Sequence, residues 1–235
     1  MMKAAPASVM LLFALSLALN LWLAGVPGWT WLLAALAGWY LADMASGVIH
    51  LVMDYYPCRS DVGLGAVYSY EGSRESDEYL SLRAVAMARI GGFQKLAYDF
   101  KNHHPRPDAL GRRSMLVQIG STICFTTLPT SLAVNLIALA VSLPGWLLFG
   151  AVIFLIGATF AQYFHGTLHR MDNPWIVRAM RRVGLLMTPH AHAIHHATLT
   201  QDFATNTGWS NPVVNRLFRL AMRRRWLTEA GLEPR

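Results

Sequence analysis

The chain has 235 residues, of which 54% are hydrophobic and only 14% are charged. An average soluble domain carries about 25% charged residues, so a soluble fold of this length would have too few charges for its surface. The composition therefore excludes a disordered chain, disfavours a soluble enzyme and favours a protein that is partly solvated by lipid.

The net charge of +7 would also suit a nucleic-acid-binding protein, but the placement of the charges argues against one. The 20 lysines and arginines fall into three stretches, namely residue 3, residues 59–113 and residues 170–235. The turns around residues 25–28 and 142–145 have none. This distribution is typical of the positive-inside rule of membrane proteins, and we expect no nucleic-acid partner.

Four segments are apolar over the roughly 20 residues that a bilayer crossing requires. They are residues 8–26, 29–55, 115–143 and 146–164. Short turns containing Pro-Gly join them into two hairpins. The positive charges place both turns outside, and they place the N-terminus, the 54–114 loop and the C-terminal tail in the cytoplasm. We therefore expect an all-α integral membrane protein, in the inner membrane of a bacterium, with a cytoplasmic histidine-rich cap.

The first span could instead be a cleaved signal peptide, because Lys3 precedes its apolar run. Its length and the lack of a clean small-x-small cleavage site favour a retained helix. We expect residues 1–235 to form a single domain, with an insertion in the cytoplasmic loop at about 58–92.

Three segments outside the spans have helical patterns. Apolar residues at helical spacing predict a short surface helix over 77–89. Residues 175–187 and 212–226 mix apolar side chains with arginines, which predicts basic amphipathic helices in the membrane interface. These helices either only orient the protein or hold a phospholipid headgroup, and the sequence leaves both possibilities open.

Nine histidines gather at the cytoplasmic ends of spans or in cytoplasmic segments. His50 and Asp54 are four residues apart, so they share one face of a helix. Asp43 lies two turns earlier on that face, and an acid inside a span is costly enough to indicate a function. Other histidines also share helix faces. His165 and His169 are four residues apart, and His192, His195 and His196 fit one side of a helical turn.

Such a collection of donors predicts a metal centre. Neutral imidazole is the commonest protein metal ligand. Eight imidazoles and one carboxylate exceed the four donors that zinc usually takes, and nitrogen and oxygen donors without thiolate suit two irons with open positions for dioxygen. The predicted ligands and catalytic residues are His50, Asp54, His103, His104, His165, His169, His192, His195 and His196.

The spacing also bears on the roles of the remaining histidines and cysteines. His103 and His104 are adjacent and cannot share a helix face, so they either reach two metal ions or reach one ion and a supporting contact. His190 would face away from His192 on the same turn and is expected to lie outside the ligand set. The two cysteines, Cys58 and Cys124, offer neither a disulfide framework nor a thiolate zinc site.

In this order, the motifs resemble those of the membrane lipid desaturase family. The matching stretches are LADMASGVIHLVMD (41–54), DFKNHHPRPDALGRR (99–113), AQYFHGTLHRMDNP (161–174), LLMTPHAHAIHH (185–196) and NTGWSNPVVNRL (206–217). The resemblance implies a di-iron, O2-dependent enzyme that introduces a double bond into an acyl or alkyl chain of a membrane lipid. It assigns the eight predicted histidine ligands and Asp54 to the family's site, and it implies electrons from a ferredoxin or cytochrome b5.

The chain also departs from the family's pattern. His103-His104-Pro105-Arg106-Pro107 replaces the HHxDP of the plasmalogen-forming branch, whereas the 111–113 and 231–235 stretches are more similar to the chloroplast branch. The headgroup, the ester or ether linkage and the position of the double bond therefore stay open. We expect the headgroup to lie near Arg112, Arg113 and the C-terminal arginines.

Three other functions compete with desaturation. A di-iron hydroxylase would use the same ligands and insert oxygen. A zinc hydrolase would be expected to carry HExxH, and the chain has no His-Glu pair. The last is a heme- or metal-binding membrane protein without enzymatic activity. A heme protein would place paired histidines at mid-membrane depth rather than in loops, and a transporter would need polar residues through the third and fourth spans, which are nearly free of charge.

Overall fold

The computed structural model describes residues 4–234, whose regular secondary structure is helical with no strand among them. Lys3 and Arg235, which the charge count includes, lie outside this range. Four helices are long and apolar enough to cross a membrane, which confirms the predicted spans. They are α1 (Ala7–Ala24), α2 (Thr30–Tyr55), the continuous helix formed by α7, η1 and α8 (Met115–Ala140), and α9 (Gly145–Leu168).

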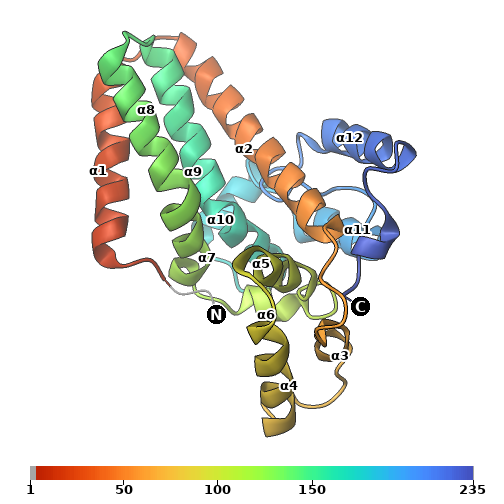
Figure 1. The fold of residues 1–235 in the computed structure, drawn as a ribbon. Coiled ribbons are helices and arrows are strands. Elements are labelled where there is room, and N and C mark those ends of the chain that lie inside the picture. The colour runs from red at the N-terminus through yellow and green to blue at the C-terminus, as the bar shows by residue number, and fades with distance from the viewer. Residues whose placement is uncertain (1–3, 235) are drawn as a thin grey trace.

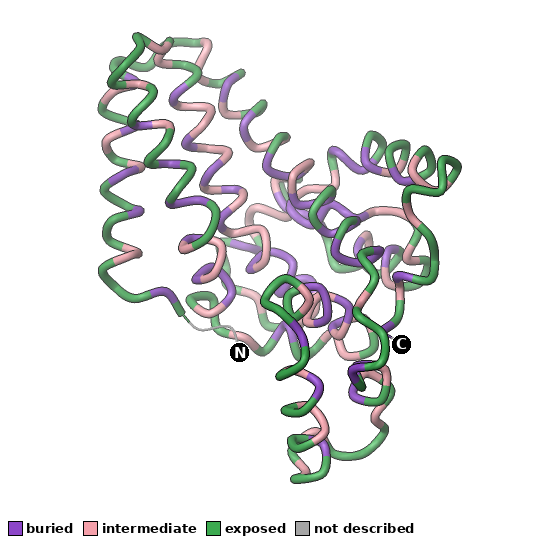
Figure 2. Tube along the Cα trace, in the orientation of Figure 1, coloured by how far each residue is buried: buried purple, intermediate pink, exposed green. Residues whose placement is uncertain are grey.

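The four helices form a bundle in which α9 packs against α2 and α1, and α1 packs against α8 (Figure 1). Their outward faces carry exposed apolar side chains, such as Leu32 at 67% and Leu136 at 68% exposure. Figure 2 shows the same pattern, with exposed residues along α1 and α8. Large apolar side chains at such exposure suit a lipid environment and not water.

The third span is interrupted by a π-helical turn that the sequence analysis did not predict. α7 (Met115–Thr122) is followed by η1 (Ile123–Thr127) and then by α8 (Leu128–Ala140). Pro129 lies in the first turn of α8, has no N–H and collides with the carbonyl of Phe125, so the regular hydrogen-bond ladder cannot continue. The wider turn leaves Phe125 84% exposed.

α1 and α8 are joined by polar side chains within the membrane. The hydroxyls of Ser16 and Ser131 lie 2.7 Å apart, and the Asn135 amide donates to the Ser16 hydroxyl at 2.7 Å. The Asn20 amide donates to the Ser131 hydroxyl at 3.1 Å. In lipid these groups have no water to bind, so the amide N–H and hydroxyl groups pair with one another across the helix pair.

α2 and α9 pack so closely that only glycine fits at two positions where they touch. A Cβ atom at Gly157 would lie 2.6 Å from the Cβ of Ala42, and one at Gly38 would lie 2.3 Å from the carbonyl oxygen of Gly150. This approach brings the ends of the two helices together, where His50 and His165 face each other with ring centroids 4.9 Å apart.

The remaining helices form a cap at the end of the bundle where α2 and α9 terminate (Figure 1). They are α3 (Leu64–Tyr68), α4 (Asp77–Ala88), α5 (Gly92–Lys101), α6 (Pro107–Gly111), α10 (Trp175–Arg182), α11 (Pro189–Thr198), α12 (Asn211–Arg223) and the 3-10 turn η2 (Glu229–Gly231). The predicted surface helix over 77–89 is confirmed as α4. α3 and α4 share an apolar cluster with α5 and project away from the bundle.

Two predicted amphipathic helices are shorter than expected. The first ends at Arg182 instead of residue 187, because Gly184 takes a left-handed conformation with φ +73° and the chain turns. The second ends at Arg223 instead of residue 226, where Arg225 has φ +58°.

Candidate metal centre

Four parts of the chain bring histidines to one place in the cap. The last turns of α2 carry His50, and the end of α9 carries His165, with His169 at its C-cap. His103 and His104 lie in the turn that follows α5, and α11 supplies three more. Some of the rings that meet come from segments more than 140 residues apart, such as His50 and His195 with centroids 4.5 Å apart.

The candidate ligands fall into two groups, in each of which the ligand atoms lie within 4.8 Å of one another. The first group, which we call the five-histidine group, comprises His103, His165, His169, His192 and His196. The second, which we call the Asp54 group, comprises His50, Asp54, His104 and His195. Together they contain all nine residues that the sequence predicted, and the adjacent His103 and His104 belong to different groups.

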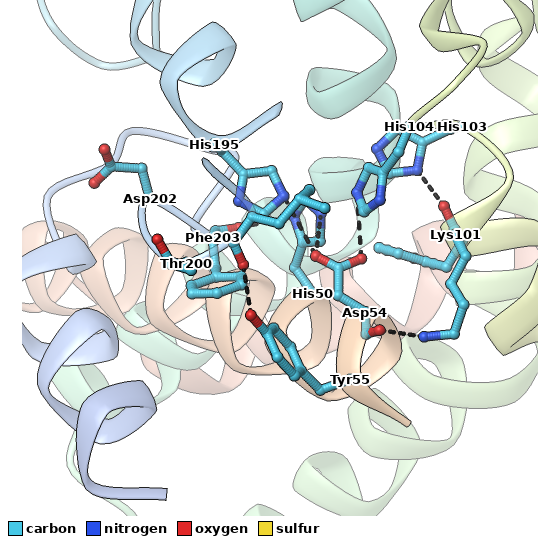
Figure 3. Close-up of polar contacts among 12 residues, drawn as sticks. His50, Asp54, Tyr55, Lys101, His103, His104, His195, Thr200, Asp202 and Phe203 are labelled. Carbon is cyan, nitrogen blue, oxygen red and sulfur yellow. Dashed lines mark hydrogen bonds and ion pairs between the residues drawn. The ribbon is translucent and has the colours of Figure 1, made fainter. Parts of the chain in front are cut away.

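In the Asp54 group, the carboxylate lies between three imidazoles (Figure 3). Asp54 Oδ2 lies 3.4 Å from His50 Nε2 and 3.3 Å from His195 Nε2, while Oδ1 lies 3.4 Å from His104 Nε2. These distances exceed those of good hydrogen bonds, and none of the five atoms has a hydrogen-bond partner among the described residues. Buried polar atoms without partners are rare, and a shared metal ion would satisfy them.

The second ring nitrogen of several histidines is held by the backbone. His50 Nδ1 lies 2.9 Å from the carbonyl oxygen of Phe203, and His195 Nδ1 lies 2.8 Å from that of Gln201. His103 Nδ1 contacts the carbonyl of Phe100 in the same way. Because a carbonyl only accepts, Nδ1 must carry the proton and Nε2 points into the site with a free lone pair. This arrangement is the usual support of metal-ligating histidines.

The electrostatic environment keeps the rings outside the spans neutral. Burial lowers the pKa of His169 to about 4 and that of His196 to about 3, and repulsion from neighbouring imidazoles acts in the same direction. Burial likewise lowers the pKa of His103, His104 and His192 below 6.5. Neutral imidazole is the form that binds metal, so the rings are ready to act as ligands near neutral pH.

His190 lies outside both groups, and its side chain is exposed. Asp43, the acid within the second span, also lies outside both groups. Its carboxylate accepts hydrogen bonds from the backbone N–H groups of Thr207, Gly208 and Ser210 at 2.7, 3.0 and 2.9 Å, and from the Ser210 hydroxyl at 2.7 Å. Asp43 therefore anchors the 203–210 segment, whose first carbonyl holds His50.

Lys101 supports the end of α2 beside the site, although its sequence position did not predict this role. Its side chain is fully buried, and its ammonium donates to the backbone carbonyl of Asp54 at the end of α2. Burial lowers the pKa of Lys101 to about 8. The only sequence signal was its position two residues before the histidine pair.

An apolar cavity of about 550 Å³ adjoins both groups. α9 supplies Ala158 and Ala161, η1 and α5 supply Phe125 and Leu96, and Arg113 lies on its wall. His50, His103 and His165 line it too. Of the arginines expected near a headgroup, Arg113 lines the cavity, whereas Arg112 and those of the C-terminal segment are not among its lining residues.

Two clusters of possible metal ligands beside an apolar cavity, in an all-helical membrane protein, are features of a metal-binding enzyme that acts on lipids. The sequence profile of the lipid desaturase domain matches residues 76–235, and the chain belongs to this family. It is thus an integral membrane enzyme, a lipid desaturase, with groups that can hold a metal cofactor.

Two curated relatives are desaturases. The plasmanylethanolamine desaturase of Myxococcus xanthus is 29% identical over 238 aligned residues, which cover 97% of this chain and 73% of that protein. The chloroplastic fatty acid desaturase 4 of Arabidopsis thaliana is 27% identical over 208 residues, which cover 86% of this chain and only 54% of that protein. No solved structure matches the chain.

Proposed function

We propose that this chain is a di-iron, O2-dependent desaturase of a membrane phospholipid. The observation that carries the proposal is the pair of ligand groups, eight imidazoles and one carboxylate, that adjoin one apolar cavity. Nitrogen and oxygen donors without thiolate favour non-heme iron. Two bound irons would supply, with dioxygen, the oxidising power that the C–H bonds of a saturated chain require.

The cavity residues would bind and align the lipid chain. Its volume is within the usual range of small-molecule sites, and its lining is predominantly apolar. His165 belongs to the five-histidine group and His50 to the Asp54 group, and both line the cavity. A chain lying in the cavity would pass both groups, with water excluded by Phe93, Leu96 and Phe100 of α5.

The reaction needs an electron donor. Removal of two hydrogens from adjacent carbons, with reduction of O2 to two waters, consumes two further electrons and two protons. We propose that a small redox protein such as a ferredoxin or cytochrome b5 supplies the electrons.

We also propose a topology for the chain in the membrane. The cap contains the basic segments 59–113 and 170–225, whereas the turns at the other end of the bundle have no lysine or arginine. By the positive-inside rule, the cap and both termini face the cytoplasm of a bacterial cell, with the spans in its inner membrane. A pH-sensitive reporter fused to the C-terminus would test this orientation.

The activity is tested with the purified chain, reconstituted with ferrous iron, a reducing system and a saturated phospholipid. We expect a product that has lost two hydrogen atoms, whereas a hydroxylase would give a product with one added oxygen atom. Asp54→Asn should abolish the product, and His190→Gln, outside both groups, should retain it. An active preparation that contains zinc and no iron would contradict the proposal.

A further inference from the structure

α12 presents three different faces along its length. Val214 and Phe218 are buried against the bundle. Val213, Leu217 and Leu220 form a second stripe, 41–45% exposed. The third stripe consists of exposed arginines, namely Arg216, Arg219 and Arg223. Each stripe has the three- and four-residue spacing of one helix face, so the helix separates an exposed apolar side from an exposed cationic side.

The packing fixes the height of α12 along the bundle. Val214 and Phe218 share an apolar cluster with Leu51 and Tyr55, in the last turns of α2. α2 has 26 residues and is therefore about 39 Å long, whereas the hydrocarbon core is about 30 Å thick. The last turns of α2, and α12 beside them, thus lie at the level of the lipid headgroups. In Figure 1, α12 projects sideways from α2 instead of running along it.

The charged side chains in α12 and in the residues directly before and after it are all positive. Residues 203–228 contain five arginines and no acidic residue. None of the ion pairs within residues 4–234 involves Arg216, Arg219 or Arg223. Trp209 and Trp226, 41% and 72% exposed, lie at the two ends of the helix, as aromatic anchors do at membrane interfaces.

We infer that α12 lies in the headgroup layer and binds anionic phospholipid there. The exposed stripe of Val213, Leu217 and Leu220 enters the boundary of the acyl chains, while the arginines of the third stripe attract the negatively charged headgroups. These arginines do not line the substrate cavity, so this surface is separate from the candidate metal centre and does not depend on the proposed reaction.

The insertion of α12 is tested with the full chain in lipid nanodiscs. Both native cysteines are first removed by Cys58→Ser and Cys124→Ser, and a fluorophore is attached through Leu217→Cys. The control carries the fluorophore through Leu80→Cys on the projecting helix α4, since Leu80 is a leucine of similar exposure at 51%. Spin-labelled lipids should quench the fluorophore at position 217 and leave the one at position 80 bright. Equal quenching at the two positions would overturn the inference and leave a water-facing or protein-binding surface.

The preference for anionic lipid is tested with spin-labelled phosphatidylglycerol and phosphatidylcholine at position 217. Phosphatidylglycerol should quench more, and each arginine removed should lower its relative affinity by about fivefold. The triple change Arg216→Gln, Arg219→Gln and Arg223→Gln should abolish the preference, and the corresponding lysine variant should keep it because the attraction is one of charge. A matched loss of charge on the projecting segment, Arg59→Gln, Arg83→Gln and Arg89→Gln, should have no effect. Equal quenching by the two lipids in the unmodified α12 would refute the anionic preference.

Discussion

The Nε2 atoms of His165 and His192 lie 3.1 Å apart, although the two residues belong to different helices, α9 and α11. Nitrogens bound at about 2.0–2.1 Å to one ion lie about 3 Å apart when they are neighbouring ligands. The separation suits an N–H···N hydrogen bond between the rings. It would also allow the two imidazoles to share a metal ion, and the ring nitrogens of three further histidines lie close enough to join them.

The two ligand groups predict the effect of single changes on metal content. His192→Gln removes a donor from the five-histidine group, and Asp54→Asn removes the charged donor from the other. Because a buried site binds through a nearly complete set of ligands, we expect each change to lower the iron content from about two to about one per chain. Elemental analysis of purified variants measures this.

The control for this prediction is His190→Gln, which changes an exposed histidine of the same helix outside both groups. It should retain the iron content of the parent chain. Loss of iron from this variant, or full occupancy in His192→Gln, would show that the groups do not act as two separate sites.

The cavity predicts that a larger side chain at its α9 wall blocks the substrate without disturbing the metal. Ala158 lies seven residues before His165, about 10 Å deeper along the helix, and both line the cavity. Ala158→Phe should lower turnover of long-chain phospholipids at least tenfold, because the ring fills space that a lipid chain needs, while iron content stays unchanged. Product analysis by mass spectrometry and elemental analysis provide the two measurements.

Ala133→Phe is the matched control, since Ala133 is exposed on α8 and is not among the cavity residues. Turnover should not change in that variant. If Ala158→Phe were as active as the parent on long chains, the lipid would have to bind elsewhere.

Hydrophobicity alone was sufficient to predict the four spans, because crossing lipid requires long apolar helices. Helical spacing was also sufficient to place His50 with Asp54 and His165 with His169, since these pairs depend only on local geometry. Helical spacing could not show which histidines share a ligand group. That division depends on how α5 and α11 turn against the bundle, and such tertiary packing leaves no local pattern.

The role of Asp43 could not be predicted from the sequence either. Its place inside a span, on the face of His50 and Asp54, indicated a function without saying which. The structure shows that four donors from residues 207–210 surround its carboxylate. The donors are mostly backbone N–H groups, which every residue except proline possesses, so the sequence offers no signal of their approach.

Asp43→Asn should therefore destabilise the fold. The amide retains one acceptor oxygen, but its NH2 group faces two of the four donors and cannot accept from them. Hydrogen bonds to a charged group contribute about 1.5–3 kcal/mol, so we expect a loss of at least about 2 kcal/mol and a lower unfolding temperature in detergent. Because the 203–210 segment also holds His50, iron should be released from the Asp54 group at a lower chelator concentration.

Asp108→Asn serves as the comparison, since the Asp108 side chain is 74% exposed and its contact with Arg112 spans 3.9 Å. That change should leave the unfolding temperature unaltered. Equal stability of the two variants would mean that Asp43 does not anchor the 203–210 segment.

The polar contacts between α1 and α8 predict a loss of stability that is separate from chemistry. Asn135→Leu removes hydrogen bonds to the hydroxyl and the carbonyl oxygen of Ser16. Such bonds between membrane helices contribute about 0.6 kcal/mol on average and at most about 1.7, so the free energy of unfolding should fall by about 1 kcal/mol. Leu136→Val, at an exposed position of the same helix, should change it far less. Because α1 and α8 contribute no member of either ligand group, turnover per iron-loaded chain should be unchanged in both variants. Reduced turnover in Asn135→Leu alone would show that the α1–α8 pair also positions the metal centre.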